Sequence, residues 1–476
     1  MVITCALSIL VLVTGACWGK AGCVVETAIE NVGSIPTTAT ARTAKDVADD
    51  KERLFRRHFV EAYESVGDRS PAWDAQALDL LEGLGKHLQG TGGPGADHLL
   101  AQTRAVLDAG CDDPLIVYYH GTLLEETGDR AGAEEVMRRG LEGLVASDYP
   151  RFRASVAAFE LAESYRDLHG EDAAEVGRYR DLSLQLLGES WSDGSFRPNE
   201  RGLFLSYLDR RWRDLDEEER EDIYRTLSSN QDVDPYVVKV VGGRYHIGAA
   251  WEARGGGWAS EVTEEGWRGF AEHLGKARRL LTEAWELHPD LPQAPTRMII
   301  VTMGGHGGPG ETLELWFYRA VAAQMDYIDA YHGILGALLP RWGGSHEEMY
   351  QLALECLNTD RFDTDVPMFY AWILHEIMVD RDDDKSWWQR PQVYDNLERM
   401  FEGYAGARQD PDELIWYESV HAATDFHTGH YEEAGRRLEA LGDELNRPIF
   451  ELYAGSLEVA RREIEVHSAI SARESQ

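Results

Sequence analysis

Positive charge is scarce in this chain of 476 residues, and lysine contributes little of it. Asp and Glu number 84 against 47 Lys and Arg, so the formal net charge is −37. A protein this acidic repels nucleic acid and anionic membrane surfaces, so we expect neither as a direct partner. The acidic surface would either keep an exported protein soluble or attract a basic partner. The lysines are Lys20, Lys45, Lys51, Lys86, Lys239, Lys276 and Lys385.

Cysteines are also few, and none has a metal-binding or redox spacing. The five are Cys5, Cys17, Cys23, Cys111 and Cys356. Without a CxxC pair or a zinc-type spacing, they predict neither a zinc site nor a disulfide framework. Complete catalytic motifs are lacking too: the chain has no GxSxG, and His375-Glu376 lacks the second histidine of HExxH. We therefore assign no catalytic residue, no cofactor and no metal from the sequence.

One acidic stretch resembles a calcium loop but departs from it at two decisive positions. Asp380, Asp382 and Asp384 have the spacing of the first three ligands. Lys385 stands where glycine makes the sharp turn, and Pro391 stands where a bidentate glutamate belongs. A solvated run of charges is therefore the preferred interpretation.

A group of histidines near the C-terminus is the other candidate for metal binding. His421 and Asp425 lie four residues apart on a predicted helix and could share a ligand. His421 also occupies a packing position between predicted helices, and His427 and His430 flank the following turn. Ordinary histidines at a helix end are the preferred interpretation.

No segment shows sustained alternation of apolar and polar residues with β-branched side chains, so we expect little or no sheet. Instead, three predicted amphipathic helices recur about every 36 residues. Their matching positions are Leu281 and Ala284, Phe317 and Ala320, and Ala353 and Cys356. A period in the mid-thirties made of helix pairs is typical of tetratricopeptide-like solenoids.

Similar helix pairs flank this central region. Residues 113–144 predict two helices that turn at Gly128-Asp129, and small residues at Gly121 and Ala133 allow close approach. Residues 154–187 predict a second pair that turns at 169–170, and 413–441 a third that turns at 429–431. The predicted fold class is therefore all-α, a tetratricopeptide-like α-solenoid of stacked helical hairpins.

The N-terminus resembles an export signal. Residues 2–13 are almost wholly apolar and too short to span a membrane comfortably. Cys17 follows small residues as in a bacterial lipobox, although Thr14 stands where leucine is preferred. We expect export to the periplasm or cell envelope, with either lipidation of Cys17 or plain cleavage. The predicted divisions are a signal at 1–22, a flexible tether at 23–50, helical hairpins at 51–254, a central domain at 255–384 and C-terminal helices at 385–476.

Several aromatic and acidic motifs between residues 255 and 380 resemble a bacterial domain-of-unknown-function family, numbered 4034. The motifs are Gly257-Trp258-Ala259, Glu265-Gly266-Trp267, Glu283-Ala284-Trp285, Glu314-Leu315-Trp316-Phe317, and the runs RWGGSHE at 341–347 and RFDTD at 361–365. The resemblance covers roughly a quarter of the chain. It implies a tetratricopeptide-like fold and no particular activity.

Tryptophans near predicted loops and helix ends are the candidate partner-binding residues. Trp258, Trp342, Trp387 and Trp388 would line a concave surface for a peptide or glycan, although most tryptophans are expected to fill helix interfaces. The expected partner is a protein or peptide. The function that follows is a protein-binding or scaffold protein at the cell envelope. A purely structural spacer remains a further alternative.

The glycine-rich stretch at 304–310 supports the competing interpretation, an uncharacterised hydrolase-like enzyme. It is spaced like a phosphate loop, but Glu311 stands where lysine would neutralise phosphate. We therefore interpret it as a connector between helices. In the enzyme alternative, this connector would cover a polar pocket formed by His306, His346 and Asp363.

Overall fold

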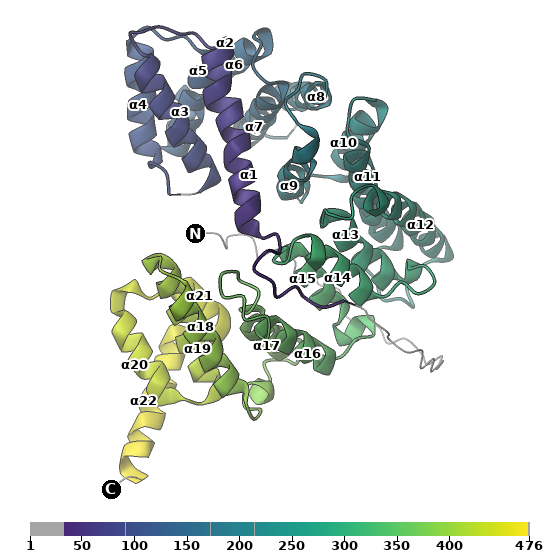
Figure 1. Cartoon of the computed structure of the whole chain (residues 1–476), viewed down its shortest axis with the longest axis vertical. Coiled ribbons are helices and arrows are strands. Elements are labelled where there is room, and N and C mark those ends of the chain that lie inside the picture. The colour runs from purple at the N-terminus through teal and green to yellow at the C-terminus, as the bar shows by residue number, and fades with distance from the viewer. Residues whose placement is uncertain (1–32, 91, 172, 214, 475–476) are drawn as a thin grey trace. The chain divides into compact units, whose positions relative to one another are not determined.

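The computed structural model describes residues 33–90, 92–171, 173–213 and 215–474. These residues form helices joined by turns and contain no strand, which confirms the all-α prediction (Figure 1). Helices that are consecutive in sequence pack as pairs: α5 with α6, α7 with α8, α11 with α12, α13 with α14, α16 with α17, and α19 with α20. No helix in the described part of the chain is long and apolar enough to cross a membrane.

The chain folds into two compact units. Of the described residues, unit 1 contains Lys45–His288, and unit 2 contains residues 33–44 and 289–474. Unit 2 is thus discontinuous in sequence. The boundary after His288 falls inside the central domain predicted at 255–384, so the compact units do not follow that predicted division.

The helices of unit 1 begin with α1, whose first residue lies at the boundary with unit 2. They are α1 (Ala44–Arg56), the π-helix η1 (Arg57–Glu61), α2 (Ala62–Val66), α3 (Asp74–Gln89), α4 (Ala96–Asp108), α5 (Pro114–Glu126), α6 (Arg130–Ala146), α7 (Arg151–His169), α8 (Ala174–Glu189), η2 (Pro198–Glu200), α9 (Arg201–Trp212), α10 (Glu217–Ser229), α11 (Pro235–Arg254) and α12 (Glu264–Leu287).

The helices of unit 2 are generally shorter and include several single turns. They are α13 (Gln293–Val301), the π-helix η3 (Thr302–His306), α14 (Leu313–Ala323), α15 (Ile328–Ala337), η4 (Pro340–Trp342), α16 (His346–Leu357), α17 (Phe369–Asp380), η5 (Lys385–Trp387), α18 (Val393–Ala407), α19 (Pro411–Thr428), α20 (Tyr431–Leu441), η6 (Gly442–Glu444), α21 (Arg447–Ala454) and α22 (Leu457–Glu474).

The predicted hairpin of residues 113–144 forms as α5 and α6. Asp113 caps α5 by accepting hydrogen bonds from the N–H groups of Leu115 and Ile116, and Gly128 makes the turn with a φ of 98°. The two helices approach closely because glycines face the partner helix. A Cβ at Gly121 would lie 2.6 Å from Met137 Cγ, and one at Gly140 would lie 2.5 Å from the Tyr118 Cα.

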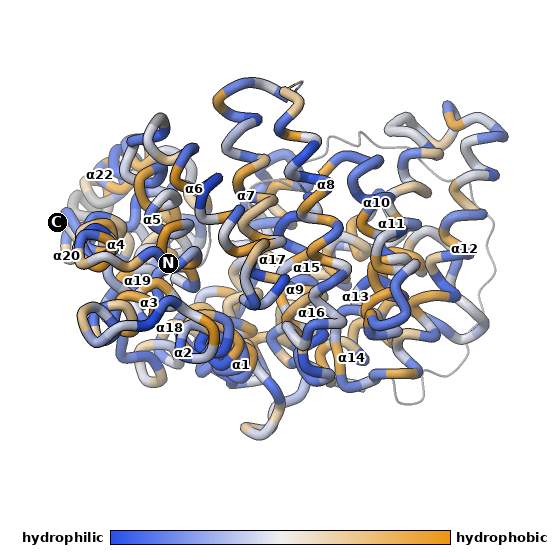
Figure 2. The backbone as a smooth tube through the Cα atoms, turned by 90° about the horizontal axis from the view of Figure 1, so that it is seen from above, coloured by the Kyte–Doolittle hydropathy of each residue, from blue (hydrophilic) through white to orange (hydrophobic). Residues whose placement is uncertain are grey.

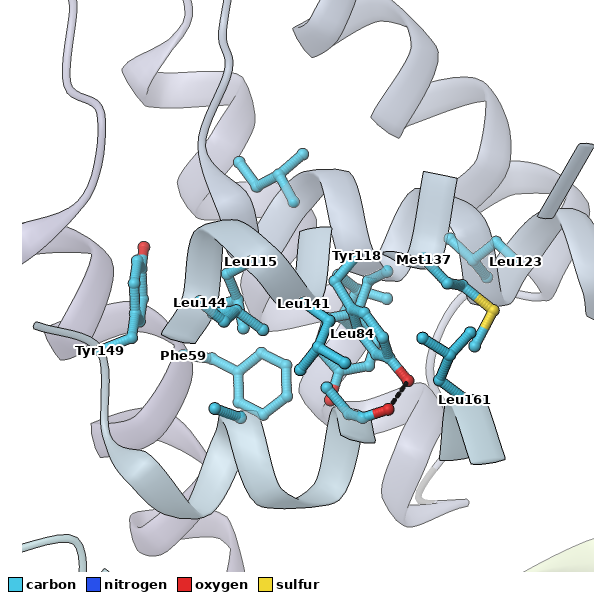
Figure 3. Close-up of a cluster of buried hydrophobic side chains, with 14 of the residues drawn as sticks. Phe59, Leu84, Leu115, Tyr118, Leu123, Met137, Leu141, Leu144, Tyr149 and Leu161 are labelled. Atoms are coloured by element: carbon cyan, nitrogen blue, oxygen red, sulfur yellow. Dashed lines mark hydrogen bonds between the residues drawn. The ribbon is translucent and has the colours of Figure 1, made fainter. Parts of the chain in front are cut away.

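A cluster of buried apolar side chains, from Phe59 in η1 to Leu186 in α8, fills the space between these helices of unit 1 (Figure 3). Leu115, Leu141, Leu144 and Leu161 are almost fully buried, and the Tyr118 hydroxyl donates to the Ala157 carbonyl, 3.1 Å away. Apolar and polar residues alternate along the helices, as expected where one face of a helix is buried (Figure 2).

The predicted 36-residue repeat falls on three helices, as expected. Leu281 and Ala284 lie on α12, Phe317 and Ala320 on α14, and Ala353 and Cys356 on α16. All six side chains are buried. The repeat therefore marks buried positions on alternate helices, α12, α14 and α16, which lie on both sides of the boundary between the units.

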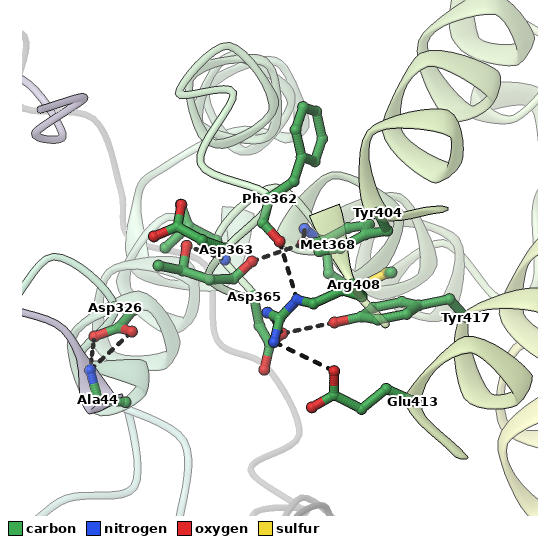
Figure 4. Close-up of polar contacts among 12 residues, drawn as sticks. Ala44, Asp326, Phe362, Asp363, Asp365, Met368, Tyr404, Arg408, Glu413 and Tyr417 are labelled. Carbon is green, nitrogen blue, oxygen red and sulfur yellow. Dashed lines mark hydrogen bonds and ion pairs between the residues drawn. The ribbon is translucent and has the colours of Figure 1, made fainter. Parts of the chain in front are cut away.

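Residues 33–44, which we call the strap, lie on unit 2, unlike the flexible tether predicted for 23–50. Ile35 is buried, and its N–H donates to the Glu355 carboxylate at 3.1 Å. The Ala44 N–H donates to both oxygens of Asp326 at 2.7 and 2.9 Å (Figure 4). The prediction failed because the strap is poor in large apolar residues and is held mainly through its backbone. Helical structure then begins at Ala44, not near Lys51.

Candidate functional sites

Two of the four predicted partner-binding tryptophans are part of the core. Trp387 is 4% exposed and Trp388 is 1% exposed. Trp388 stacks on His427 with ring centroids 5.1 Å apart, and the Arg390 guanidinium covers Trp387. This corrects the expectation that both residues line a surface: the turn that carries them, η5, is folded against α17.

The other two tryptophans are accessible but belong to different units. Trp258, in the loop after α11 of unit 1, is 38% exposed. Trp342 ends η4 in unit 2 and is half-buried. Their role in partner binding remains a prediction for each unit separately.

The glycine-rich stretch forms the π-helix η3 followed by a tight turn. The Glu311 side chain turns back and accepts a hydrogen bond from the Gly308 N–H at 2.7 Å. This loop N–H is therefore bonded to a carboxylate of the chain itself. The three residues of the enzyme alternative have different partners. His306 Nδ1 contacts the Gly304 carbonyl, His346 pairs with Asp380 at 2.8 Å, and Asp363 pairs with Arg361 at 2.7 Å.

In the stretch that resembles a calcium loop, the carboxylates of Asp380 and Asp384 also accept hydrogen bonds from the chain itself. Asp380 accepts from Arg341 at 3.1 Å, and Asp384 accepts from Arg381 and from the N–H and hydroxyl of Ser386. These hydrogen bonds lower the pKa of Asp384 to about 2. The stretch is thus a capped turn in which the carboxylates of Asp380 and Asp384 already have donors.

The RFDTD run at 361–365 acts as a brace within unit 2 (Figure 4). Arg408 donates to the Phe362 carbonyl and to Asp365, each at 3.0 Å, and the Tyr417 hydroxyl donates to Asp365 at 2.8 Å. Arg361 donates to the carbonyl of Thr38 in the strap. The motif therefore joins three segments of unit 2 by hydrogen bonds and has a structural role.

A groove with a volume of about 840 Å³ lies between α6 and α8 in unit 1. Both helices pack against α7, which holds them apart. Leu141 and Tyr179 are buried, Val145 and Leu182 are half-buried, and Gly177 contributes no side chain. These residues give the groove an apolar character.

Charged side chains rim this groove. Glu142 on α6 and Asp181 on α8 are exposed, and Arg178 lies beside Tyr179 with its guanidinium 5.4 Å from the ring centroid. Gln185 completes the lining. An apolar depression with a charged rim is the usual form of a surface that receives a peptide or helix.

A buried polar cluster lies between α18, α19 and α20 of unit 2. His421 and Asp425 share one face of α19 because they are four residues apart. His421 Nε2 lies 2.7 Å from a Glu398 oxygen on α18 and 3.7 Å from an Asp425 oxygen. The Phe401 ring stacks on the imidazole at 4.0 Å and fixes its plane.

Arg437, on α20, completes this cluster. Its guanidinium donates to Asp425 at 2.9 Å, to Glu418 at 3.0 Å and to Glu398 at 3.4 Å. Three carboxylates therefore surround one guanidinium, and the formal charge of the set is negative when the carboxylates are ionised.

Burial controls the titration of this cluster. Desolvation, assisted by the positive charge of Arg437, lowers the pKa of His421 to about 3, so the ring is neutral at physiological pH. Desolvation raises the pKa of Asp425 to about 7, although the hydrogen bond from Arg437 opposes this shift. Since Nε2 lies closest to Glu398, it carries the imidazole proton, and Nδ1 has no hydrogen-bond partner among the described residues.

Sequence reasoning found only half of this cluster. The spacing of His421 and Asp425 pointed to a shared site, but Glu398 and Arg437 are distant in sequence and lie in no recognisable motif. Only the packing of three helices brings the four side chains together.

Comparisons with other proteins assign no identity to the chain. No protein-family model matches the sequence, and no curated protein matches it. The resemblance of residues 255–380 to family 4034 therefore remains a prediction. Cys17 and the export signal lie outside the described residues.

Proposed function

We propose that the protein is an exported, tetratricopeptide-like solenoid that binds a partner segment in the groove between α6 and α8 and acts as a scaffold at the cell envelope. Helix pairs with glycine turns and small residues at their contacts support the solenoid proposal. The groove is the observation that carries the binding proposal. The apolar run at residues 2–13 supports export.

The groove favours an amphipathic helix with an apolar face and basic edges. Val145, Leu182 and the edge of Tyr179 would receive the apolar side chains. Glu142 and Asp181 rim the groove beside Arg178, and Glu142 also pairs with Arg138 at 2.7 Å. The preference for Lys or Arg side chains at the edges therefore rests on the exposed Asp181 and on the strong acidity of the whole chain. Such electrostatic complementarity would speed association and select against acidic partners.

Fluorescence anisotropy with two synthetic peptides of equal length tests this proposal. One is a Leu/Lys amphipathic helix and the other is its Leu/Glu counterpart. We expect the full chain to bind only the Leu/Lys peptide and to lose that binding in Leu182→Asn. The double variant Glu142→Lys/Asp181→Lys should reverse the charge preference.

A control with the same change in net charge distinguishes a groove from general attraction. Glu218→Lys/Glu265→Lys alters two exposed acidic residues of unit 1 outside the groove lining. It should leave Leu/Lys binding unchanged beyond a small ionic-strength effect. Equal losses in both double variants, or no binding to either peptide, would contradict the proposal.

The export part of the proposal has its own measurement. Expression of the full chain with its N-terminus intact, followed by mass spectrometry of the mature N-terminus, should show cleavage in the region of residues 14–23. Lipidation would appear as an acylated Cys17 at the new N-terminus. An uncleaved chain that remains in the cytoplasm would refute the envelope location without bearing on the groove.

A further inference from the structure

The cluster on α18, α19 and α20 has the composition of a metal site as well as that of an ion network. One oxygen of Glu398, one of Asp425 and one ring nitrogen of His421 all lie within 4.8 Å of one another. In a tetrahedral zinc site, bonds of about 2.0–2.2 Å place neighbouring ligand atoms roughly 3.4 Å apart. The observed separations of 2.7 and 3.7 Å from Nε2 bracket that value.

We propose that Glu398, His421 and Asp425 bind a divalent transition-metal ion of the Zn²⁺ class, and that Arg437 leaves the cluster when the ion enters. One imidazole and two carboxylates suit this class of ion, and solvent would supply the fourth ligand. This site lies in unit 2 and is independent of the groove proposed above.

The ligands are held in place before any ion arrives. His421 is 3% exposed and Asp425 is 1% exposed, so neither side chain is free to rotate into solvent. Stacking on Phe401 fixes the imidazole, and α18 and α19 pack directly against each other. Metal sites inside helical bundles are built in this way, from facing side chains of neighbouring helices.

Charge makes the exchange of Arg437 for a divalent ion favourable. Glu398, Glu418 and Asp425 bring three potential negative charges, and one guanidinium neutralises only one of them. The Arg437 side chain is 19% exposed, so it can turn outward on its flexible stem and keep Glu418, 44% exposed, as its partner. On binding, the imidazole proton moves from Nε2 to Nδ1, so the ring stays neutral, and a proton held by Asp425 is released to solvent.

The competition between Arg437 and the ion gives the proposal its sharpest test. The probe is Zn²⁺ alone, titrated by calorimetry into the chelator-treated full chain, with Co²⁺ absorption to report the coordination geometry. We expect one equivalent to bind, with affinity reduced by ~10-fold or more in Glu398→Gln. Arg437→Gln should bind Zn²⁺ more tightly than wild type, since it removes the competing cation.

Matched controls separate this site from the many surface carboxylates. Glu402→Gln lies one turn further along α18 on an exposed residue, and Arg462→Gln changes an exposed arginine of α22. Both should bind Zn²⁺ as the wild type does, and circular dichroism should confirm that every variant is helical. Weak binding that Glu398→Gln leaves unchanged, or an Arg437→Gln variant that loses stability without gaining Zn²⁺ affinity, would overturn the proposal and leave a purely structural ion network.

Discussion

The helices α5–α8 of unit 1 and α17–α21 of unit 2 contain similar hairpins but are stabilised differently. In α5–α8, glycines bring the backbones of α5 and α6 together, and leucines fill the space between the helices. No described histidine of α5–α8 is buried. The buried Asp113 caps α5 and accepts a hydrogen bond from the Tyr149 hydroxyl.

The α17–α21 region instead has a polar core. His375, His421 and His427 are buried, and the Nδ1 atom of each has no partner among the described residues. Asp425 lies beside them with Arg437 as its counterion. The comparison teaches that a helical-hairpin sequence pattern specifies where the chain turns and how closely its two helices pack. It does not specify whether the side chains between the helices are apolar or polar. One region should therefore respond to changes in shape and the other to changes in charge.

The largest expected effect is on shape, from Gly140→Ala in α6. The new Cβ would lie 2.5 Å from backbone atoms of Tyr118, which cannot move unless α5 and α6 separate. We expect unit 1 to lose about 2–3 kcal/mol of unfolding free energy. Urea unfolding followed by circular dichroism, fitted with two transitions, measures it.

Gly275→Ala in α12 is the control for this change, because its new Cβ would meet nothing within 4 Å. It should be neutral or stabilise the helix by up to ~1 kcal/mol. Equal losses in the two variants would show that close approach does not hold α5 and α6 together.

The next largest effect is the loss of folding stability at acid pH, which arises from the buried histidines of the α17–α21 region. Burial lowers the pKa of His427 to about 4 and that of His375 to about 4. Below pH ~6.5 these two histidines become protonated in the unfolded chain but stay neutral in the folded chain. The free energy of unfolding therefore falls as the pH drops toward 4. At pH 5 each histidine should cost roughly 2 kcal/mol relative to pH 7.

Thermal unfolding of His427→Gln between pH 7 and pH 5 tests this expectation. The variant should lose less stability on acidification than the wild type, in the transition that belongs to unit 2. His98→Gln changes an exposed histidine of α4 and should keep the wild-type pH dependence. If His427→Gln also keeps it, the polar core is not what makes this region sensitive to acid.

The smallest expected effect concerns one hydrogen bond in the RFDTD brace. Tyr417→Phe removes the donor to Asp365 and should cost about 1–1.5 kcal/mol of unit 2 stability. Tyr453→Phe is the matched control, since the Tyr453 hydroxyl makes no hydrogen bond among the described residues. Chemical denaturation of the two variants should separate them, and indistinguishable midpoints would mean that the brace contributes nothing measurable.

The sequence predicted the helices and their turns well because those signals are local. The turn at 128–129 and the apolar helix faces on which the repeat positions lie both depend on residues a few places apart. The RFDTD run stands out in the sequence as a motif, but its partners Arg408 and Tyr417 lie more than 40 residues away. Its hydrogen bonds to those residues could therefore not be predicted from the sequence.

Burial of individual side chains was harder to predict. Trp387 and Trp388 follow a charged loop and were expected near a surface, but the turn folds back and places both in the core. Glu398 and Arg437 carry no local signal that separates them from the chain's many other charged residues. Sites assembled from several helices depend on tertiary packing, which a single sequence does not reveal.

The strap has a consequence for the order in which the protein can be made. It leaves the ribosome before residues 45–288 of unit 1, but its contacts at Asp326, Glu355 and Arg361 are encoded 282 to 323 residues later. At about 5–20 residues per second, this delay lasts roughly 15–60 seconds. Unit 1 can fold during that interval, whereas unit 2 stays incomplete at one edge until synthesis is nearly finished. Throughout that time the strap is available to chaperones and to the machinery that handles nascent chains.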